Sequence, residues 1–392
     1  MSVNSLSFEQ AASLLNAIRK QATGADPVSM VNSSDFVSVA TVTLANGVDP
    51  ILNSISQLIG RTIFSVRPYS RKFAGLYMDA QRFGYITRKL QVADKDFSNS
   101  SRFALVDGQS VDHWVVSKAN VLSTQFYGQN IFEKQAPTVY KDQLDVAFSS
   151  PEELSRFYVM QLQNTLDMIE QSKETVTRMT IANMIGGKIA ASNGIVHCLT
   201  EYNTETGITP ALTNVTVFDP ANFGEFCKWL FARMENVSNM MTERSELYQI
   251  NVTGKVINHH TPKDRQKAYI LSKFLGEMKA RVTSGAFNKS FLEFSDVEEV
   301  NYWQGINTPD AINVTPVYMK TDGTLETAAN PVSQAGILGI MFDEEALGVN
   351  VFNEYVLTTP MNAKGAYSNS FYHFTQRYFN DYCEKFVCFI LD

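Results

Sequence analysis

The triplet Gly186-Gly187-Lys188 is the first candidate for chemistry, because glycine-rich loops followed by lysine cradle phosphates. Such a loop also needs an earlier glycine at a fixed spacing and a serine or threonine directly after the lysine. Those positions hold Ala182 and Ile189 here, so the motif fails twice. The paired glycines instead predict the end of a helix.

Two histidine motifs could also carry chemistry. His197 and Cys198 are sequence neighbours, but a nucleophile and its base must meet in space, and no supporting motif surrounds them. They predict a buried cysteine beside a structural histidine. His259 and His260 would point to opposite faces of a strand, and no further ligand stands at a useful spacing. We therefore expect no catalytic, cofactor-binding or metal-binding residues and no cofactor.

The cysteines and carboxylates add no signature of a disulfide scaffold or of a known class of enzyme. Cys198, Cys227, Cys383 and Cys388 are too few for a disulfide scaffold and form no Cys-x-x-Cys pair, which favours a reduced, intracellular setting. Signatures of serine hydrolases, zinc proteases and dinucleotide-binding enzymes do not occur in the chain. A carboxylate-pair hydrolase stays open, since no particular pair is singled out. The expectation is a protein that is not an enzyme.

Composition sets the class of protein. The 392 residues are 44% apolar and 19% charged, which excludes a disordered chain and a coiled-coil rod. The net charge of −7 argues against a strongly basic nucleic-acid binder. No segment approaches the roughly 18 apolar residues of a membrane helix, and Met1–Lys20 lacks the features of a signal peptide. No membrane contact is expected.

The clearest local signal starts a long helix. Ser150 is an N-cap residue, Pro151 suits the first helical position, and Glu153 completes a capping box. Neither proline nor glycine follows until the glycine pair, so the pattern predicts a helix from Pro151 to about Ile185. Its length would be about 50 Å. The alternative is two helices joined near Ser172.

Other elements follow from the same periodicities. Helices are predicted in the first twenty residues and after two Asp-Pro pairs, and buried strands near the C-terminus. The Asp-Pro pairs are Asp49-Pro50 and Asp219-Pro220, and the strands are Ile337–Phe342 and Phe386–Ile390. Asp35–Leu44 has an alternating pattern of Phe36, Val39 and Val42 that does not decide its element, and Lys267–Phe274 fits both helix and strand patterns.

A basic, strand-rich excursion separates the first helices from the long one. Arg61–Lys89 carries a net charge of +6, so the rest of the chain carries −13. Three interpretations stay open: a solvated hairpin face, a projecting loop that docks on an acidic neighbour, or a nucleic-acid loop. The third is the least favoured, because no nucleic-acid-binding motif accompanies the cations.

The order of these parts resembles the major capsid proteins of tailed bacteriophages, which share the Hong Kong 97 fold. Local sequence also resembles one branch of that family. The matching stretches are DFVSVATVTL at Asp35–Leu44, ISQLIGRTIFSVRPY at Ile55–Tyr69, DGQSVDHW at Asp107–Trp114, TQFYGQNIFEK at Thr124–Lys134 and FNDYCEKFVCFIL at Phe379–Leu391. Residues 204–349 are the least closely matched.

The resemblance implies an α+β protein of the Hong Kong 97-like capsid fold. It implies an N-terminal arm with short helices, an extended loop, a peripheral domain with a long spine helix, and an axial domain. The corresponding ranges are 1–66 for the arm, 67–149 for the extended loop, 150–206 for the peripheral domain, 207–349 for the axial domain, and 350–392 for C-terminal strands that return to the peripheral domain.

The resemblance also implies a function. Copies would assemble as pentamers and hexamers into an icosahedral shell around double-stranded DNA, which the acidic wall would contact non-specifically. Scaffold, portal and decoration proteins are further possible partners. The place would be the virion capsid, assembled in the bacterial host cytoplasm. Within the basic excursion, we predict assembly contacts to an acidic neighbour by Arg67, Arg71, Lys72 and Arg82.

Three alternatives remain at this point. The first is a nanocompartment shell protein of the same fold, which would enclose cargo enzyme and no genome. The second is another virion structural protein, which would form a tube or ring. The third is the uncharacterised hydrolase left open by the carboxylates.

Overall fold

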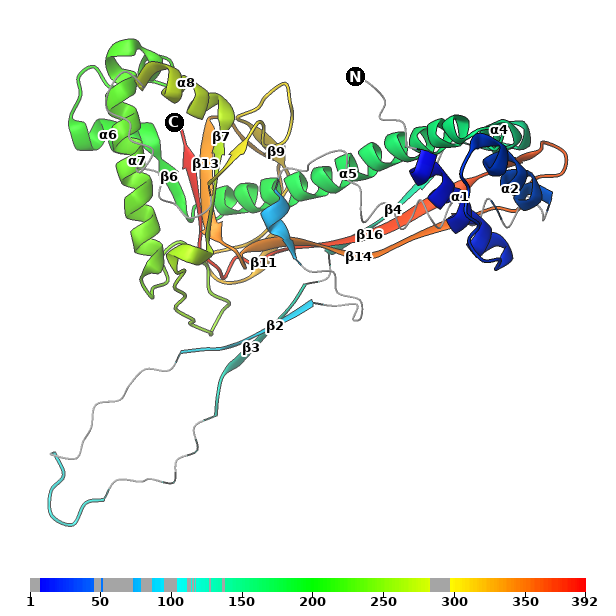
Figure 1. Ribbon diagram of the computed structural model, residues 1–392. Helices are drawn as coiled ribbons and strands as arrows, with labels where there is room; N and C mark the ends of the chain where they lie inside the picture. Colours follow the sequence, from blue (N-terminus) through cyan, green and yellow to red (C-terminus); the bar gives the residue numbers. More distant parts are fainter. Residues whose placement is uncertain are drawn as a thin grey trace. The chain divides into compact units, whose positions relative to one another are not determined.

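The computed structural model describes residues 8–45, 51, 73–78, 87–94, 104–110, 114, 116, 118–126, 128–135, 138–282 and 297–392. The chain divides into two compact units, each built from segments far apart in the sequence (Figure 1). Unit 1 comprises Met1–Phe83, Gln129–Thr175 and Asn350–Arg377, and unit 2 comprises Gly84–Gly128, Val176–Val349 and Tyr378–Asp392. Both contain helices and strands, so the predicted α+β class is confirmed.

Unit 1 packs helices against a sheet of strand order β1-β14-β16-β4. Its helical elements are α1 (Phe8–Thr23), α2 (Ser33–Ala45), η1 (Ala74–Leu76), α4 (Lys141–Ala147) and the first part of α5 (Pro151–Ala190). Its strands are β1 (Tyr77–Met78), β5 (Val139–Tyr140), β15 (Tyr367–Ser368) and most of β4 (Gly128–Gln135), β14 (Leu347–Thr358) and β16 (Ser370–Asn380). One apolar core joins Leu15, Phe36, Leu144, Leu154 and Phe374.

Helix α2 settles the ambiguous segment Asp35–Leu44. The Asn32 Oδ1 atom accepts a hydrogen bond from the Asp35 N–H at 2.9 Å and so caps the helix. Phe36 and Ala40, one turn apart, are fully buried in the core of unit 1. Burial on a helical period therefore outweighs the low helix propensity of the β-branched residues in this segment.

Helix α5 confirms the strongest local prediction and extends it. It runs unbroken over 40 residues. The Ser150 Oγ atom accepts the Glu153 N–H at 3.2 Å, as the capping signal predicts. The alternative of two helices joined near Ser172 is wrong, because Ser172 donates to the Met168 carbonyl at 2.9 Å within the continuous helix.

The predicted helix end at Gly186-Gly187 is also wrong, since α5 continues to Ala190. These glycines let side chains of other elements pack closely against α5. A Cβ at Gly187 would lie 2.1 Å from the Tyr382 Oη atom, and one at Gly186 would lie 2.6 Å from the Val314 Cγ2 atom. Close packing, and not termination, explains both residues.

Unit 2 is built on a five-stranded sheet of order β6-β17-β13-β7-β8. Its strands are β6 (Ile195–His197), β7 (Gln266–Leu271), β8 (Val297–Val300), β13 (Ile337–Asp343) and β17 (Phe386–Ile390). Its helical elements are the rest of α5, α6 (Cys198–Thr206), η2 (Thr216–Phe218), α7 (Pro220–Thr242), η3 (Lys263–Arg265) and α8 (Ser272–Val282). The paired strands β9 (Ile312–Val314) with β12 (Val332–Gln334), β10 (Val317–Met319) with β11 (Leu325–Thr327), and β2 (Thr87–Val92) with β3 (Val121–Phe126) complete it.

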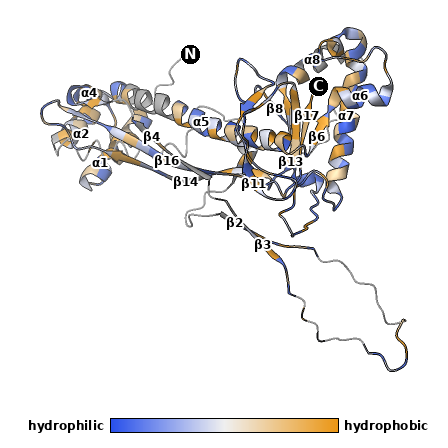
Figure 2. Cartoon of the chain, turned by 180° about the vertical axis from the view of Figure 1, so that it is seen from behind, coloured by the Kyte–Doolittle hydropathy of each residue, from blue (hydrophilic) through white to orange (hydrophobic). Residues whose placement is uncertain are grey.

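Strands β13 and β17 of this sheet are mostly apolar along their length (Figure 2). Every residue of β13 and β17 is buried, and β17 lies inside the sheet between β6 and β13, so both predicted buried strands are confirmed. The helix predicted after Asp219-Pro220 is α7. The ambiguous segment Lys267–Phe274 divides between the end of β7 and the start of α8.

The predicted first helix is confirmed as α1. The helix predicted after Asp49-Pro50 lies outside the described residues, except for the helical residue Ile51. Across the described part of the chain, no helix combines the length and the apolar character needed to cross a bilayer.

Candidate interaction surfaces

The hairpin of β2 and β3 has two unlike faces. The strands are antiparallel, with Leu90 opposite Ser123 and Val92 opposite Val121. Leu90, Val92 and Val121 are 60%, 59% and 46% exposed. Because side chains alternate along a strand, Lys89 and Gln91 lie on the opposite face. The outer face thus exposes Leu90, Val92 and Val121 to solvent, while Leu122, opposite Gln91, is buried on the inner face.

The polar face of the hairpin is held to acidic residues of unit 2. The Lys89 Nζ atom lies 3.2 Å from Asp381 Oδ2 and 3.1 Å from Glu345 Oε2, and it pairs with Glu384. Gln91 donates to the Glu384 Oε1 atom at 3.2 Å. We call Lys89 with Asp381, Glu384 and Glu345 the Lys89 cluster.

Burial and charge compete in the Lys89 cluster. Burial works against the charged form of Lys89, but Asp381, Glu384 and Glu345 outweigh it and raise the pKa of the lysine. Burial also works against ionised Glu384, but hydrogen bonds and charge from His259 and Lys89 hold the pKa of Glu384 at about 2. Lys89 and Glu384 therefore keep their charges over the whole neutral range.

A second set of bonds fixes the base of the hairpin, next to β2. The backbone N–H of Asp94 donates to the Val256 carbonyl at 2.9 Å. The Asp94 carboxylate accepts the Asn258 N–H at 2.8 Å and pairs with Arg244. With these bonds and the Lys89 cluster, the orientation of the hairpin base within unit 2 is determined by polar contacts.

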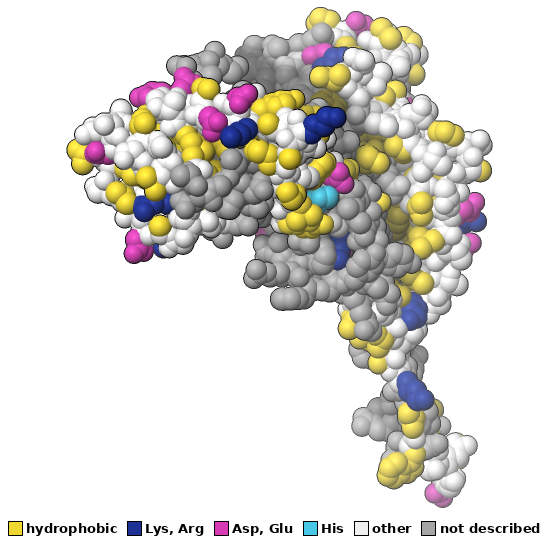
Figure 3. Space-filling model, turned by 90° about the vertical axis from the view of Figure 1, so that its right-hand side faces the viewer, with side chains coloured by type: hydrophobic (Ala, Val, Ile, Leu, Met, Phe, Trp, Pro, Cys, Tyr) yellow, Lys and Arg dark blue, Asp and Glu magenta, His cyan; other side chains and the backbone are white. Residues whose placement is uncertain are grey.

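The apolar character continues beyond the paired strands. Val106, Trp114 and Val116, between β2 and β3 in the sequence, are 66%, 81% and 79% exposed. Apolar side chains are exposed along the projecting part of unit 2 (Figure 3). A turn is present at Asp107-Gly108, with Gly108 at a φ of 84°. Large exposed aromatic and aliphatic groups of this kind are typical of protein interfaces.

Unit 1 has an exposed apolar surface of its own. On β14, Tyr355 and Leu357 are 47% and 57% exposed, and the His373 ring of β16 stacks on Tyr355 with ring centroids 4.9 Å apart. Along β16, His373 alternates with Tyr372 and Phe374, which lie in the core, and on β14 Val356, between Tyr355 and Leu357, packs against that core. The outer face of this sheet is therefore a second candidate interaction surface.

The sequence-predicted contact residues Arg67, Arg71, Lys72 and Arg82 lie outside the described residues. Lys89 belongs to the same basic stretch and is described. It pairs with acidic residues of its own chain, so part of the charge complementarity expected between neighbours is used within one subunit.

A family model described as Phi29-like phage major capsid protein matches residues 15–390. The chain belongs to this family. It is thus a major capsid protein of the tailed phages, and the resemblance seen in the sequence is confirmed. This result selects the phage capsid over the nanocompartment and over other virion parts. No curated protein matches the chain.

Solved structures agree with the capsid fold. The capsid structure of Staphylococcus phage Andhra matches with a TM-score of 0.53 at 9% identity, covering 82% of this chain and 84% of that one. A structure described as the head fiber and inner core protein of native bacteriophage P68 matches with a TM-score of 0.51 at 8% identity, covering 82% and 85%. The predicted Hong Kong 97-like fold is confirmed.

In this capsid protein, three of the residues first considered for chemistry are buried or lie beside carboxylates of the same chain. Cys198 is buried as predicted, and burial raises its thiol pKa. The exposed His197 lies 2.8 Å from the Asp392 carboxylate. His259 lies 3.1 Å from Glu384, in contact with the Lys89 cluster. Among the residues that the structure describes, no three His, Cys, Asp or Glu side chains gather as a metal site.

Charge dominated the sequence-based choice of contact residues, and the apolar hairpin face was missed. The signal was present in the sequence Lys89-Leu90-Gln91-Val92, which alternates polar and apolar residues as a half-buried strand does. Which face the chain itself covers could not be read from that alternation, because the acidic partners of Lys89 lie almost 300 residues later.

Proposed function

We propose that copies of this capsid protein assemble as pentamers and hexamers into an icosahedral shell around double-stranded DNA, and that the chain catalyses no reaction. The observation that carries this proposal is the apolar outer face of the β2–β3 hairpin, formed by Leu90, Val92 and Val121. A two-stranded ribbon has no core of its own, so this face needs a second chain to cover it. A neighbouring subunit in a shell supplies that chain.

The domain map from the resemblance fits this role. The proposed assignment keeps 1–66 as the arm, 67–149 as the extended loop, 150–206 as the peripheral domain with the spine helix, 207–349 as the axial domain, and 350–392 as returning strands. The hairpin then lies in the extended loop, and α5 is the spine helix. Long loops and arms enlarge an interface without enlarging the core, which favours permanent contacts.

Charge supports the remaining parts of the proposal. An acidic wall, with −13 outside the basic stretch, would contact packaged DNA only weakly and non-specifically. Scaffold, portal or decoration proteins would complete the particle, which would assemble in the bacterial host cytoplasm and persist as the virion capsid.

Electron microscopy of the purified chain, with light scattering of the same sample, tests the proposal directly. Closed shells of uniform size, or isolated pentamers and hexamers, are the expected result. A stable monomer of 43.9 kDa at all salt concentrations would contradict the proposal and would favour the enzyme alternative again.

The double substitution Leu90→Ser and Val92→Ser is expected to prevent shell formation. Burying a leucine or valine is worth about 1.5–3 kcal/mol, so losing two such contacts should raise the subunit concentration needed for assembly by about 100-fold or more. Both side chains face solvent in the subunit, so its melting temperature should stay within about 2 °C of the wild type. The control Leu90→Val with Val92→Ile keeps the apolar volume and should assemble. If the serine variant formed normal shells, the outer face of the hairpin would not be part of the interface between subunits.

Reversing the charge of two predicted contact residues, Arg67→Glu with Arg71→Glu, is expected to block assembly at low salt. Two attractive contacts to an acidic neighbour become repulsive, and added salt should restore part of the assembly by screening. The charge-preserving pair Arg67→Lys with Arg71→Lys serves as control. Particle yield by sedimentation measures the effect, and normal yield from the glutamate variant would exclude these residues as contacts.

A further inference from the structure

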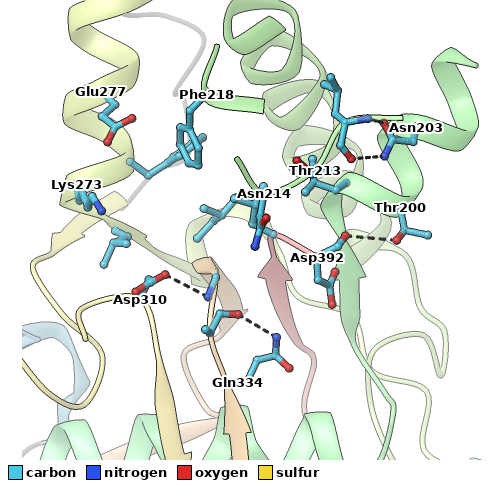
Figure 4. Close-up of a pocket in the computed structure, with 18 residues that line it drawn as sticks. Thr200, Asn203, Thr213, Asn214, Phe218, Lys273, Glu277, Asp310, Gln334 and Asp392 are labelled. Carbon is cyan, nitrogen blue, oxygen red and sulfur yellow. Dashed lines mark hydrogen bonds between the residues drawn. The ribbon is translucent and has the colours of Figure 1, made fainter. Parts of the chain in front are cut away.

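Unit 2 contains a pocket of about 610 Å³ at one edge of its five-stranded sheet (Figure 4). Strands β6, β7, β8 and β17 run in one direction and β13 in the other. The pocket is lined by residues that follow β6, β7 and β17, including Thr200, Lys273 and Asp392, and by Gly336 just before β13. It therefore lies at the carboxyl edge of the parallel strands, where open α/β sheets bind ligands.

The floor of the pocket is apolar. Phe274, Leu338 and Leu391 are buried beneath it, and the half-buried Phe218 ring lines one wall. Its volume lies within the range of small-molecule sites, which combine such a floor with a few polar groups that orient the ligand. An aliphatic chain of several carbons would cover this floor and lose contact with water.

The walls of the pocket carry a net negative charge. Glu277 and Asp310 lie on one side and Asp392 on the other, and among the described residues Lys273 is the single cation that lines the pocket (Figure 4). The formal charge of these four side chains is −2. Among the described residues, the Asp310 Oδ2 atom accepts a long bond from the Gly336 N–H at 3.3 Å, and a carboxylate has capacity for further donors.

We propose that this pocket binds an organic ammonium ion with an aliphatic body, its ammonium group at the Asp310 carboxylate and its carbon chain on the apolar floor. An ammonium ion donates up to three hydrogen bonds, and charge-assisted bonds to a carboxylate are stronger than neutral ones. Lys273 lines the same pocket, and its positive charge opposes that of the ammonium ion and limits the affinity. The site goes beyond the shell-forming function and does not depend on it.

Calorimetric titration of the purified full-length chain tests the site with two probes of equal chain length, hexylamine and hexanoate. The amine should bind with saturation, and the carboxylate should bind at least about tenfold more weakly. Equal or tighter binding of hexanoate would overturn the proposal, and so would the absence of saturable amine binding to the folded chain.

Two variants with opposite expected effects make the test specific. Asp310→Asn should weaken hexylamine binding about tenfold, while its amide oxygen can still accept the Gly336 N–H and preserve the loop. Lys273→Met removes the competing cation and should tighten binding severalfold. Weaker amine binding by the methionine variant would contradict the proposal that the pocket prefers a cation and that Lys273 opposes its binding.

The control variant is Glu225→Gln on α7, an exposed carboxylate that does not line the pocket. It should bind hexylamine like the wild type. Equal weakening by this variant and by Asp310→Asn would show that the amine responds to the overall charge of the protein, and the pocket would be excluded. Thermal melting of each variant confirms that the fold is retained.

Discussion

Replacing Lys89 with methionine is expected to lower the free energy of unfolding of unit 2 by about 3–5 kcal/mol at neutral pH. The substitution removes the shared cation of Asp381 and Glu384, whose side chains are 3% and 5% exposed. Each would be left as a buried charge with fewer partners, and that penalty exceeds the loss of the pair itself. Glu345 is 45% exposed and contributes little.

The pH dependence of this loss has a definite sign. The native pKa of Glu384 is about 2, below its ordinary value of 4.5. The unfolded state therefore binds more protons in this range, so the contribution of Glu384 to stability is present above the ordinary pKa and is lost as the pH falls towards 2. Without Lys89 the pKa of Glu384 should rise. The stability difference between wild type and variant should thus be largest above about pH 5 and narrow below it.

Urea unfolding at neutral and acidic pH measures this difference, and hydrogen exchange of the β2 and β3 amides reports on the hairpin. The control is Lys228→Met, which breaks an exposed pair with Glu225 at 2.7 Å and should cost less than about 1 kcal/mol. If Lys89→Met were as mild as this control at neutral pH, the Lys89 cluster would not anchor the hairpin.

The apolar and the charged face of the hairpin have complementary roles. The Lys89 cluster and the contacts of Asp94 fix the hairpin base on its own subunit. That leaves Leu90 and Val92 facing outwards in a defined orientation. An interface that is oriented before binding loses less conformational entropy on association. Polar contacts within the subunit therefore favour apolar contacts between subunits.

Local sequence predicted the elements whose signals do not depend on distant residues. Ser150, Pro151 and Glu153 start α5 through a capping pattern that acts within one turn. The run Phe386–Ile390 is apolar throughout and can only be satisfied inside a sheet. Such elements are recognisable because propensity, pattern and burial agree.

Other elements needed tertiary information. Asp35–Leu44 is rich in β-branched residues, and its helix depends on a core formed with Leu15 and with residues more than 100 positions later. The segment Lys267–Phe274 is ambiguous because a strand passes directly into a helix at Leu271–Ser272. In both cases the local sequence fits two structures, and packing against distant residues selects one.

The interaction surfaces show the same division. Net charge pointed to the basic stretch, because charge can be counted without knowing the fold. The exposed face of Leu90 and Val92 depends on which side of the hairpin Asp381 and Glu384 occupy. The pocket at Asp310 gathers residues from helices, strands and loops spread over half of the chain. Neither could be located before the topology was known.

The substitution Gly187→Ala is expected to destabilise the protein by about 3 kcal/mol, although alanine is the better helix former. The added Cβ would lie 2.1 Å from the Tyr382 Oη atom and 2.8 Å from the Tyr318 Cβ atom, so the side chain of Tyr382 must move. The hydroxyl of the buried Tyr382 donates to the Val317 carbonyl at 3.0 Å, and that hydrogen bond would be lost as well. Thermal and urea unfolding measure the effect.

A matched substitution and a double-variant cycle separate packing from helix propensity. Gly276→Ala lies in α8 with no atom within 4 Å of the added Cβ, so it should stabilise by about 0.5–1 kcal/mol. Tyr382→Phe removes the hydroxyl that the new methyl group of Gly187→Ala would meet, so the two substitutions together should cost clearly less than the sum of their separate effects. Additive costs, or a neutral Gly187→Ala, would show that α5 tolerates a side chain here and that the paired glycines have another cause.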